Sequence, residues 1–233
     1  MLDLVGTTVL TAALAVNLNA AVTAMPLSSA QKLTTVALAG LWIGLAIALA
    51  TTGIYASQAT PVPAVGVMVG LPLIVVGGAA LLSDRVRQAL LALPVPLLVG
   101  LNILRVFAGG FMVLLALQGR LSGPFRQFAG WGDVMVGLIA IPLTAATAHN
   151  FSRNRRAVLA WNVLGTLDLV TAVSLGVSSA PGSPLQAFGE TIGSTAMWSL
   201  PWSTIPTLLV PFYFIAHGVI FAHLARANRV AMA

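Results

Sequence analysis

Seven runs of apolar residues alternate with short polar segments along the chain. They cover about residues 4–25, 34–55, 62–82, 95–117, 130–148, 157–177 and 203–225. A helix needs roughly 20 apolar residues to cross the hydrocarbon core of a bilayer, and each run is close to that length. The pattern therefore predicts an all-α membrane protein: a bundle of seven transmembrane helices that forms one domain over residues 1–233.

The first of these runs is the most polar. It contains several threonines together with Asn17 and Asn19, but no charged residue interrupts it. We therefore count it as a span. If it does not cross the membrane, the other six spans keep their orientation and only the N-terminus changes side.

The basic residues between the runs are divided unequally between the two sides of the predicted bundle. Arg120 and Arg126 fall on one side, and eight fall on the other: Lys32, Arg85, Arg87, Arg153, Arg155, Arg156, Arg226 and Arg229. Lysine and arginine accumulate in cytoplasmic loops. We therefore expect the N-terminus outside and the C-terminus inside, with the protein in the inner (plasma) membrane of a bacterium.

Composition agrees with a lipid environment and excludes several classes of protein. Apolar residues make up 58% of the chain and charged residues 7%, whereas soluble domains contain about 25% charged residues. The net charge of +6 comes from short clusters between the apolar runs, not from a continuous basic face, so we expect no nucleic-acid partner. The chain has no cysteine, which excludes disulfides, thiolate metal sites and cysteine catalysis.

Ionisable side chains inside three of the runs carry the candidate chemistry. Arg105 and Asp168 are near the midpoints of the fourth and sixth runs, and His217 is about 4.5 Å from the middle of the seventh, on its cytoplasmic side. An unpaired guanidinium at that depth costs several kcal/mol. We therefore predict an ion pair between Arg105 and Asp168, which can be bidentate. Asn102 lies three residues before Arg105, on the same helix face.

The sequence GWGD, which ends at Asp133, has two interpretations. As a helix start, it places Trp131 at the membrane interface and Asp133 in the first turn, where an acidic side chain suits the helix dipole. Alternatively, Asp133 lines an outer vestibule with Arg120, Arg126 or Glu190, and we include it among the predicted substrate-binding residues.

The longest predicted loop runs from about residue 178 to residue 202. It contains Phe188, Trp198 and Trp202. Aromatic side chains are enriched at the headgroup region of a bilayer. We therefore expect these three rings at the outer membrane interface.

No catalytic motif is recognisable. The chain contains no Walker, HExxH or Gly-x-Ser-x-Gly signature. A covalent retinal is excluded because the seventh run has no lysine; the only lysine is Lys32. Whether the protein is an enzyme is left open.

The leading hypothesis is a small transporter that moves a small solute or protons through the Arg105 and Asp168 centre. It predicts the lipid bilayer and a small-molecule or ion substrate as partners, and no cofactor or metal. One alternative is a structural or accessory membrane subunit, in which the pair only fixes helix packing. Another is a membrane-embedded haem protein or enzyme that uses His217, or His149 with His223. Oligomerisation or a partner membrane subunit fits all three.

Overall fold

The computed structural model describes residues 1–56, 64–189 and 191–232, and it is built from helices. No strand occurs among the described residues, so the predicted all-α class is confirmed. The α-helices are α1 (Leu2–Ala24), α2 (Ser29–Thr51), α3 (Ala64–Leu82), α4 (Asp84–Leu91), α5 (Val95–Leu101), α6 (Arg105–Leu117), α7 (Gly123–Ser178) and α8 (Val210–Met232). Short helical turns are η1 (Ile54–Ala56), η2 (Asn102–Leu104), η3 (Thr195–Trp198) and η4 (Ile205–Leu209).

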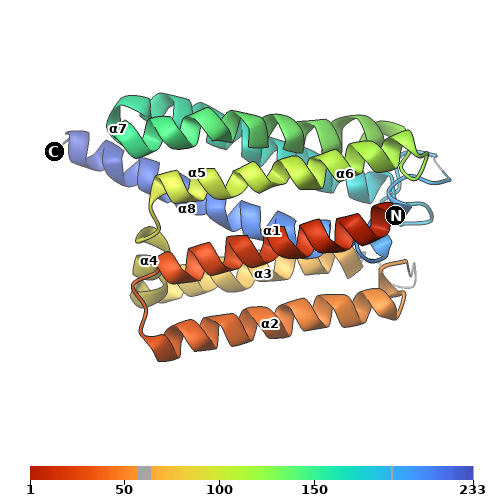
Figure 1. Cartoon of the computed structure of the whole chain (residues 1–233), viewed down its shortest axis with the longest axis horizontal. Helices are drawn as coiled ribbons and strands as arrows, with labels where there is room; N and C mark the ends of the chain where they lie inside the picture. Colours follow the sequence, from red (N-terminus) through yellow and green to blue (C-terminus); the bar gives the residue numbers. More distant parts are fainter. Residues whose placement is uncertain (57–63, 190, 233) are drawn as a thin grey trace.

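Helix α7 is a hairpin of two helical arms. Asn150 has non-helical backbone angles (φ −156°, ψ 96°), and the chain reverses there, as the green and teal ribbons of Figure 1 show. We call residues 123–149 the first arm and residues 151–178 the second arm. The indole Nε1 of Trp161 in the second arm donates to the carbonyl oxygen of Val136 in the first, at 3.0 Å. The arms correspond to the fifth and sixth predicted runs.

The reversal at Asn150 is stabilised by its own side chain. The Oδ1 atom of Asn150 accepts a hydrogen bond from the backbone N–H of Arg153 at 2.9 Å. An asparagine oxygen three residues before a backbone N–H is the usual cap of a helix start. Asn154 adds a second link, because its Nδ2 donates to the carbonyl oxygens of Asn150 and Ala146. The basic turn therefore contains the N-terminal cap of the second arm, and the second arm begins immediately after the chain reverses.

The fourth predicted run is a single rod made of α5, η2 and α6. It spans Val95–Leu117, with the tighter turn η2 at Asn102–Leu104 immediately before Arg105. The buried side chain of Asn102 donates from Nδ2 to the carbonyl oxygen of Leu98 at 2.9 Å. This rod packs along the first arm of α7.

Six helices of the described chain are long and apolar enough to cross a membrane. They are α1, α2, α3, the rod Val95–Leu117, the hairpin α7 and the segment Ile205–Ala227. The helix boundaries differ from the predicted runs by a few residues at most ends. The largest differences are seven residues: α7 begins at Gly123, before the predicted start at 130, and α8 ends at Met232, after the predicted end at 225.

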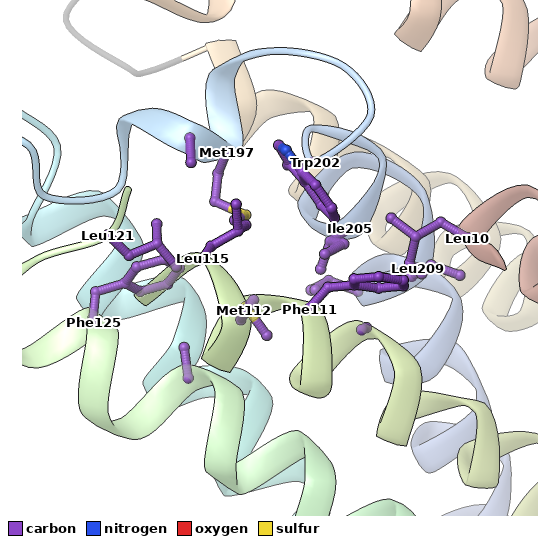
Figure 2. Close-up of a cluster of buried hydrophobic side chains, with 14 of the residues drawn as sticks. Leu10, Phe111, Met112, Leu115, Leu121, Phe125, Met197, Trp202, Ile205 and Leu209 are labelled. Atoms are coloured by element: carbon purple, nitrogen blue, oxygen red, sulfur yellow. The ribbon is translucent and has the colours of Figure 1, made fainter. Parts of the chain in front are cut away.

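The loop from residue 179 to residue 204 folds onto the bundle, and Trp202 is its main anchor. Its side chain is fully buried, and its ring lies 5.4 Å from that of Phe111 (Figure 2). Its indole Nε1 donates to Oδ1 of Asp3 at 2.8 Å. Trp202 is therefore enclosed by α1 and α6, and its depth in a membrane stays a prediction. Phe188 and Trp198 are half-buried.

The two ends of the bundle differ in charge. Figure 1 places α4, the bend of α7 and the C-terminal part of α8 at one end, and the N-terminus at the other. The first end collects most of the basic residues, including Arg87, Arg153 and Arg226. At the other end, Nη1 of Arg120 forms an ion pair with Oδ1 of Asp3 at 2.8 Å.

Candidate functional site

Arg105 lies at the centre of the bundle with no exposed surface, between two carboxylates. Its Nε donates to Oδ1 of Asp133 at 2.6 Å, and its Nη2 donates to Oδ2 of Asp168 at 2.5 Å. Each carboxylate thus accepts a hydrogen bond from a different nitrogen of the guanidinium. The predicted contact with Asp168 is present, but it is single and not bidentate, because Asp133 takes the neighbouring nitrogen.

The third nitrogen of the guanidinium has two further partners. Nη1 of Arg105 lies 3.3 Å from the carbonyl oxygen of Gly165 and 3.1 Å from Nε2 of His217. The Tyr213 ring centre is 5.6 Å from Cζ of Arg105. We call Arg105, Asp133, Asp168 and His217 the Arg105 cluster. Helix α6, both arms of α7 and helix α8 each supply one member.

His217 has a defined tautomer in this arrangement. A guanidinium only donates hydrogen bonds, so Nε2 of His217 must accept and carries no proton. The ring proton is then on Nδ1, which lies 2.7 Å from Oδ1 of Asn162. Asn162 also donates from Nδ2 to the backbone carbonyl of His217 at 3.1 Å. Both ring nitrogens are therefore engaged, and the imidazole is neutral.

Glycines let α6 and the first arm of α7 approach closely enough for Arg105 to reach Asp133. A Cβ atom placed on Gly109 would overlap the carbonyl oxygen of Gly130 and would lie 2.7 Å from Cβ of Asp133. A Cβ on Gly130 would lie 3.0 Å from the carbonyl oxygen of Gly109. Any larger side chain at Gly109 must push the two helices apart.

Two more glycines make room for the other members of the cluster. A Cβ on Gly132 would overlap the carboxylate of Asp168, and its distance to Cγ would be 2.6 Å. A Cβ on Gly165 would lie 2.6 Å from Cε1 of His217. The space for both side chains is thus created by the absence of a side chain on the facing helix.

Asp133 does not lie at a helix start. Helix α7 begins at Gly123, ten residues earlier, which at 1.5 Å per residue puts Asp133 about 15 Å into the helix. It is 5% exposed and paired with Arg105, whereas Arg120 pairs with Asp3. The alternative with Glu190 concerns a residue outside the described ranges.

Other residues of the sequence-based prediction lie near the cluster without joining it. Asn102 is buried, but its amide donates to Leu98, and its Oδ1 has no partner among the described residues. Conversely, the sequence-based prediction does not include Asn162, because it is six residues before Asp168 and therefore lies on another face of that helix. The sequence feature that could have indicated its role is its position three residues before Gly165, because His217 packs against Gly165.

A small cavity lies beside Asp133. Its volume is about 70 Å³, and its walls come from α3, α6, α7, η4 and the loop after α7. The lining is apolar, for example Val69, Met112 and Val210, and Asp133 is the only charged residue among the described residues that line it. A cavity of about 10–15 Å³ is enough to hold one water molecule, so this cavity has room for water.

The histidines do not assemble into a ligand set. His149 is exposed beside the bend of α7, and Nε2 of His223 lies 3.0 Å from the carbonyl oxygen of Leu93. His217 is engaged by Arg105 and Asn162. Among the described residues, no group of three histidine, aspartate or glutamate side chains could hold a metal ion. Of the candidate haem ligands, His217 therefore has both ring nitrogens engaged by protein side chains.

The charges of the cluster do not cancel. Arg105 carries one positive charge, His217 is neutral, and two aspartates contact the same guanidinium. With both aspartates ionised, the cluster carries one net negative charge in an apolar interior. Two carboxylates that share a site favour binding of a proton to one of them. A proton or a small cation would therefore neutralise the cluster.

One family model matches the chain. It describes a domain of unknown function (DUF8737), and it covers residues 62–225. The chain belongs to this family. The matched region contains the whole Arg105 cluster together with Asn162 and excludes helices α1 and α2. No curated protein and no solved structure matches the chain.

Proposed function

We propose that this protein is an integral membrane protein with seven crossings, formed by α1, α2, α3, the rod Val95–Leu117, the two arms of α7, and η4 with α8. The apolar exterior supports this proposal: Leu41 is 70% exposed, Ile74 72% and Leu164 59%. Soluble proteins rarely expose such large apolar areas. The basic end of the bundle would face the cytoplasm, which gives an N-out, C-in topology in a bacterial inner membrane.

Within that frame, the protein acts as a small proton-coupled transporter, and the Arg105 cluster is its proton-binding centre. The observation that carries this proposal is the second carboxylate on Arg105. Ionisable groups inside a membrane mark substrate paths and proton relays. A carboxylate pair with a single cation is neutral when one proton is bound, and charged when that proton leaves.

Asp168 is the carboxylate from which the proton exchanges. Its side chain is 13% exposed, against 7% for Asp133 and none for Arg105. Asp133 borders the 70 Å³ cavity, which also reaches Ala180 and Ser194 of the loop after α7 and supplies space for water beside the cluster. A proton could thus move between Asp168 and that cavity through the two carboxylates.

A purely structural role accounts for less of this geometry. A buried pair that only fixes helix packing needs one arginine and one carboxylate, which together are neutral. The second aspartate adds an uncompensated charge and a desolvation cost. That extra carboxylate is what a proton-binding role requires.

The direct test is proton movement across a membrane. Purified protein is reconstituted into liposomes that contain a trapped pH-sensitive dye, and an imposed pH gradient is followed in the presence of a potassium ionophore. We expect the wild type to dissipate the gradient faster than protein-free liposomes. Asp168→Asn should fold normally and reduce the rate to the protein-free level.

Asp84→Asn is the matched control, because it removes an exposed carboxylate that pairs with Arg87 outside the cluster. It should leave the rate unchanged. A wild type that is no faster than empty liposomes, with and without candidate small solutes, would contradict the transport proposal.

A further inference from the structure

A long groove lies between α3, α4 and α8, away from the Arg105 cluster. Its volume is about 760 Å³, within the usual range of small-molecule sites. Its walls are apolar, with Val76 and Leu81 on α3, Leu90 on α4 and Ile215 on α8. The charged lining residues are Arg87 and Arg226.

The two arginines lie at one end of this groove. Arg226 is near the C-terminal end of α8, and Arg87 is on α4, which follows the last turn of α3. Figure 1 places α4 and the C-terminal part of α8 at the same end of the bundle, where the basic residues gather. Arg87 also pairs with the exposed carboxylate of Asp84. Two arginines, one of them already paired, thus mark the surface end of an apolar channel.

The length of the groove matches one leaflet of a bilayer. Along α8 its lining runs from Phe214 to Arg226, which is about 18 Å at 1.5 Å per residue. Half of a 30 Å hydrocarbon core is about 15 Å. A chain that enters at the arginines would end near the bilayer midplane.

Two glycines keep the groove open. Gly77 of α3 and Gly218 of α8 both line it, and a Cβ on either would meet no atom within 4 Å. Helices α3 and α8 are therefore not closed against each other here. The missing side chains leave room for a flexible hydrocarbon chain.

We propose that this groove binds one anionic phospholipid of the cytoplasmic leaflet, with its phosphate between Arg87 and Arg226 and an acyl chain along Gly77 and Gly218. Arginine suits a phosphate because of its planar set of donors, and the apolar walls suit the chain. The inference rests on the membrane embedding proposed above and is independent of proton binding at Asp168.

Native mass spectrometry of the detergent-purified protein tests this proposal with two phospholipids of equal chain length. Phosphatidylglycerol is anionic, and phosphatidylcholine carries no net charge. We expect one molecule of phosphatidylglycerol to bind more tightly than phosphatidylcholine. Arg87→Gln with Arg226→Gln should weaken phosphatidylglycerol binding roughly 10- to 30-fold. Phosphatidylcholine binding should weaken less, because its quaternary ammonium offsets the charge of its phosphate.

The matched charge control is Arg153→Gln with Arg156→Gln, which removes two exposed cations from the same end of the bundle but outside the groove. Equal loss of phosphatidylglycerol binding in both double variants would overturn the proposal, since it would reflect surface charge alone. Displacement of the lipid by inorganic phosphate at similar concentration would also overturn it, because the site would then recognise a free anion.

The matched shape control compares two glycines that both face open space. Gly218→Leu fills the groove and should lower the binding of both lipids several-fold, whereas Gly110→Leu on α6 lies outside the groove and should not. If the wild type forms a dimer without bound lipid and Gly218→Leu dissociates that dimer, the groove is an interface between two copies of the chain, and the lipid proposal is overturned. Asp168→Asn should bind phosphatidylglycerol like the wild type. The lipid-binding test therefore stays valid even if the protein moves no protons.

Discussion

Arg105 is surrounded by four hydrogen-bond acceptors. Two of them are the carboxylates of Asp133 and Asp168, which share this one guanidinium. Buried polar groups in proteins are normally satisfied, and this guanidinium follows that rule. The unusual feature is the net charge, because one cation faces two aspartates. Stability and function at this site therefore depend on how many charges are present, not on any one residue alone.

Arg105→Gln should be the most damaging of the single substitutions in the cluster. It leaves two buried carboxylates without a cation, and breaking a buried pair in this way costs about 3–5 kcal/mol. For a chain of this size, the midpoint of thermal unfolding in detergent should fall by about 10 °C or more. Asp168→Asn leaves a neutral pair of Arg105 and Asp133, so its midpoint should stay within about 3 °C of the wild type.

The double variant Asp133→Asn with Asp168→Asn completes this series. It leaves Arg105 as an uncompensated buried cation, so its unfolding midpoint should fall about as far as that of Arg105→Gln. If Asp168→Asn alone is as unstable as either of these variants, both carboxylates are needed for packing, and the charge-counting argument fails.

At the residue scale, the sequence was sufficient to predict that Arg105, Asp168 and His217 occupy similar depths. Depth follows from counting residues along apolar runs, and the observed contacts agree with it. The pairing of Asp133 with Arg105 could not be predicted, because it depends on where α7 begins. The apparent helix start at GWGD hid seven earlier residues that are helical.

The approach of α6 to the first arm of α7 rests on glycines, and two neighbouring glycines allow a matched test. A Cβ on Gly109 would overlap the backbone of Gly130, while a Cβ on Gly110 would meet nothing within 4 Å. Gly109→Ala should lower the thermal unfolding midpoint by several degrees, as overpacking costs about 1–3 kcal/mol. Gly110→Ala should leave it unchanged or raise it slightly, because alanine favours a helix.

The same comparison has a functional part. Gly109→Ala would move Asp133 away from Arg105, so it should also slow proton movement in liposomes, whereas Gly110→Ala should not. Equal behaviour of the two variants in both measurements would mean that α6 and α7 are not packed as closely as the structure shows.

At the element scale, apolar run length predicted most helices well, because burial in lipid requires a continuous apolar segment. It also separated the two arms of α7, since the basic turn around Asn150 interrupts the pattern. Run length could not predict that Trp202 is enclosed. That position depends on the contact with Asp3, which lies 199 residues away in the sequence.

The topology of the whole molecule can be tested because the chain contains no cysteine. Single cysteines are introduced at exposed positions, namely Gln118, Leu185, Ser29 and Ser152. With an N-out topology, Gln118→Cys and Leu185→Cys should react with a membrane-impermeant maleimide in intact cells. Ser29→Cys and Ser152→Cys should react only after the membrane is permeabilised. Labelling of all four in intact cells, or the reverse pattern, would contradict the proposed orientation.

The central claim is that the Arg105 cluster binds one proton that it can release, and infrared spectroscopy of the reconstituted protein tests it most directly. The chain has only five acidic side chains, so a protonated carboxylic acid in an apolar site gives a C=O stretch that few groups could produce. We expect the wild type to gain this band as the pH is lowered, and Asp168→Asn to lack it while Asp84→Asn retains it. A band that is absent from the wild type, or unchanged in both Asp168→Asn and Asp133→Asn, would contradict the account.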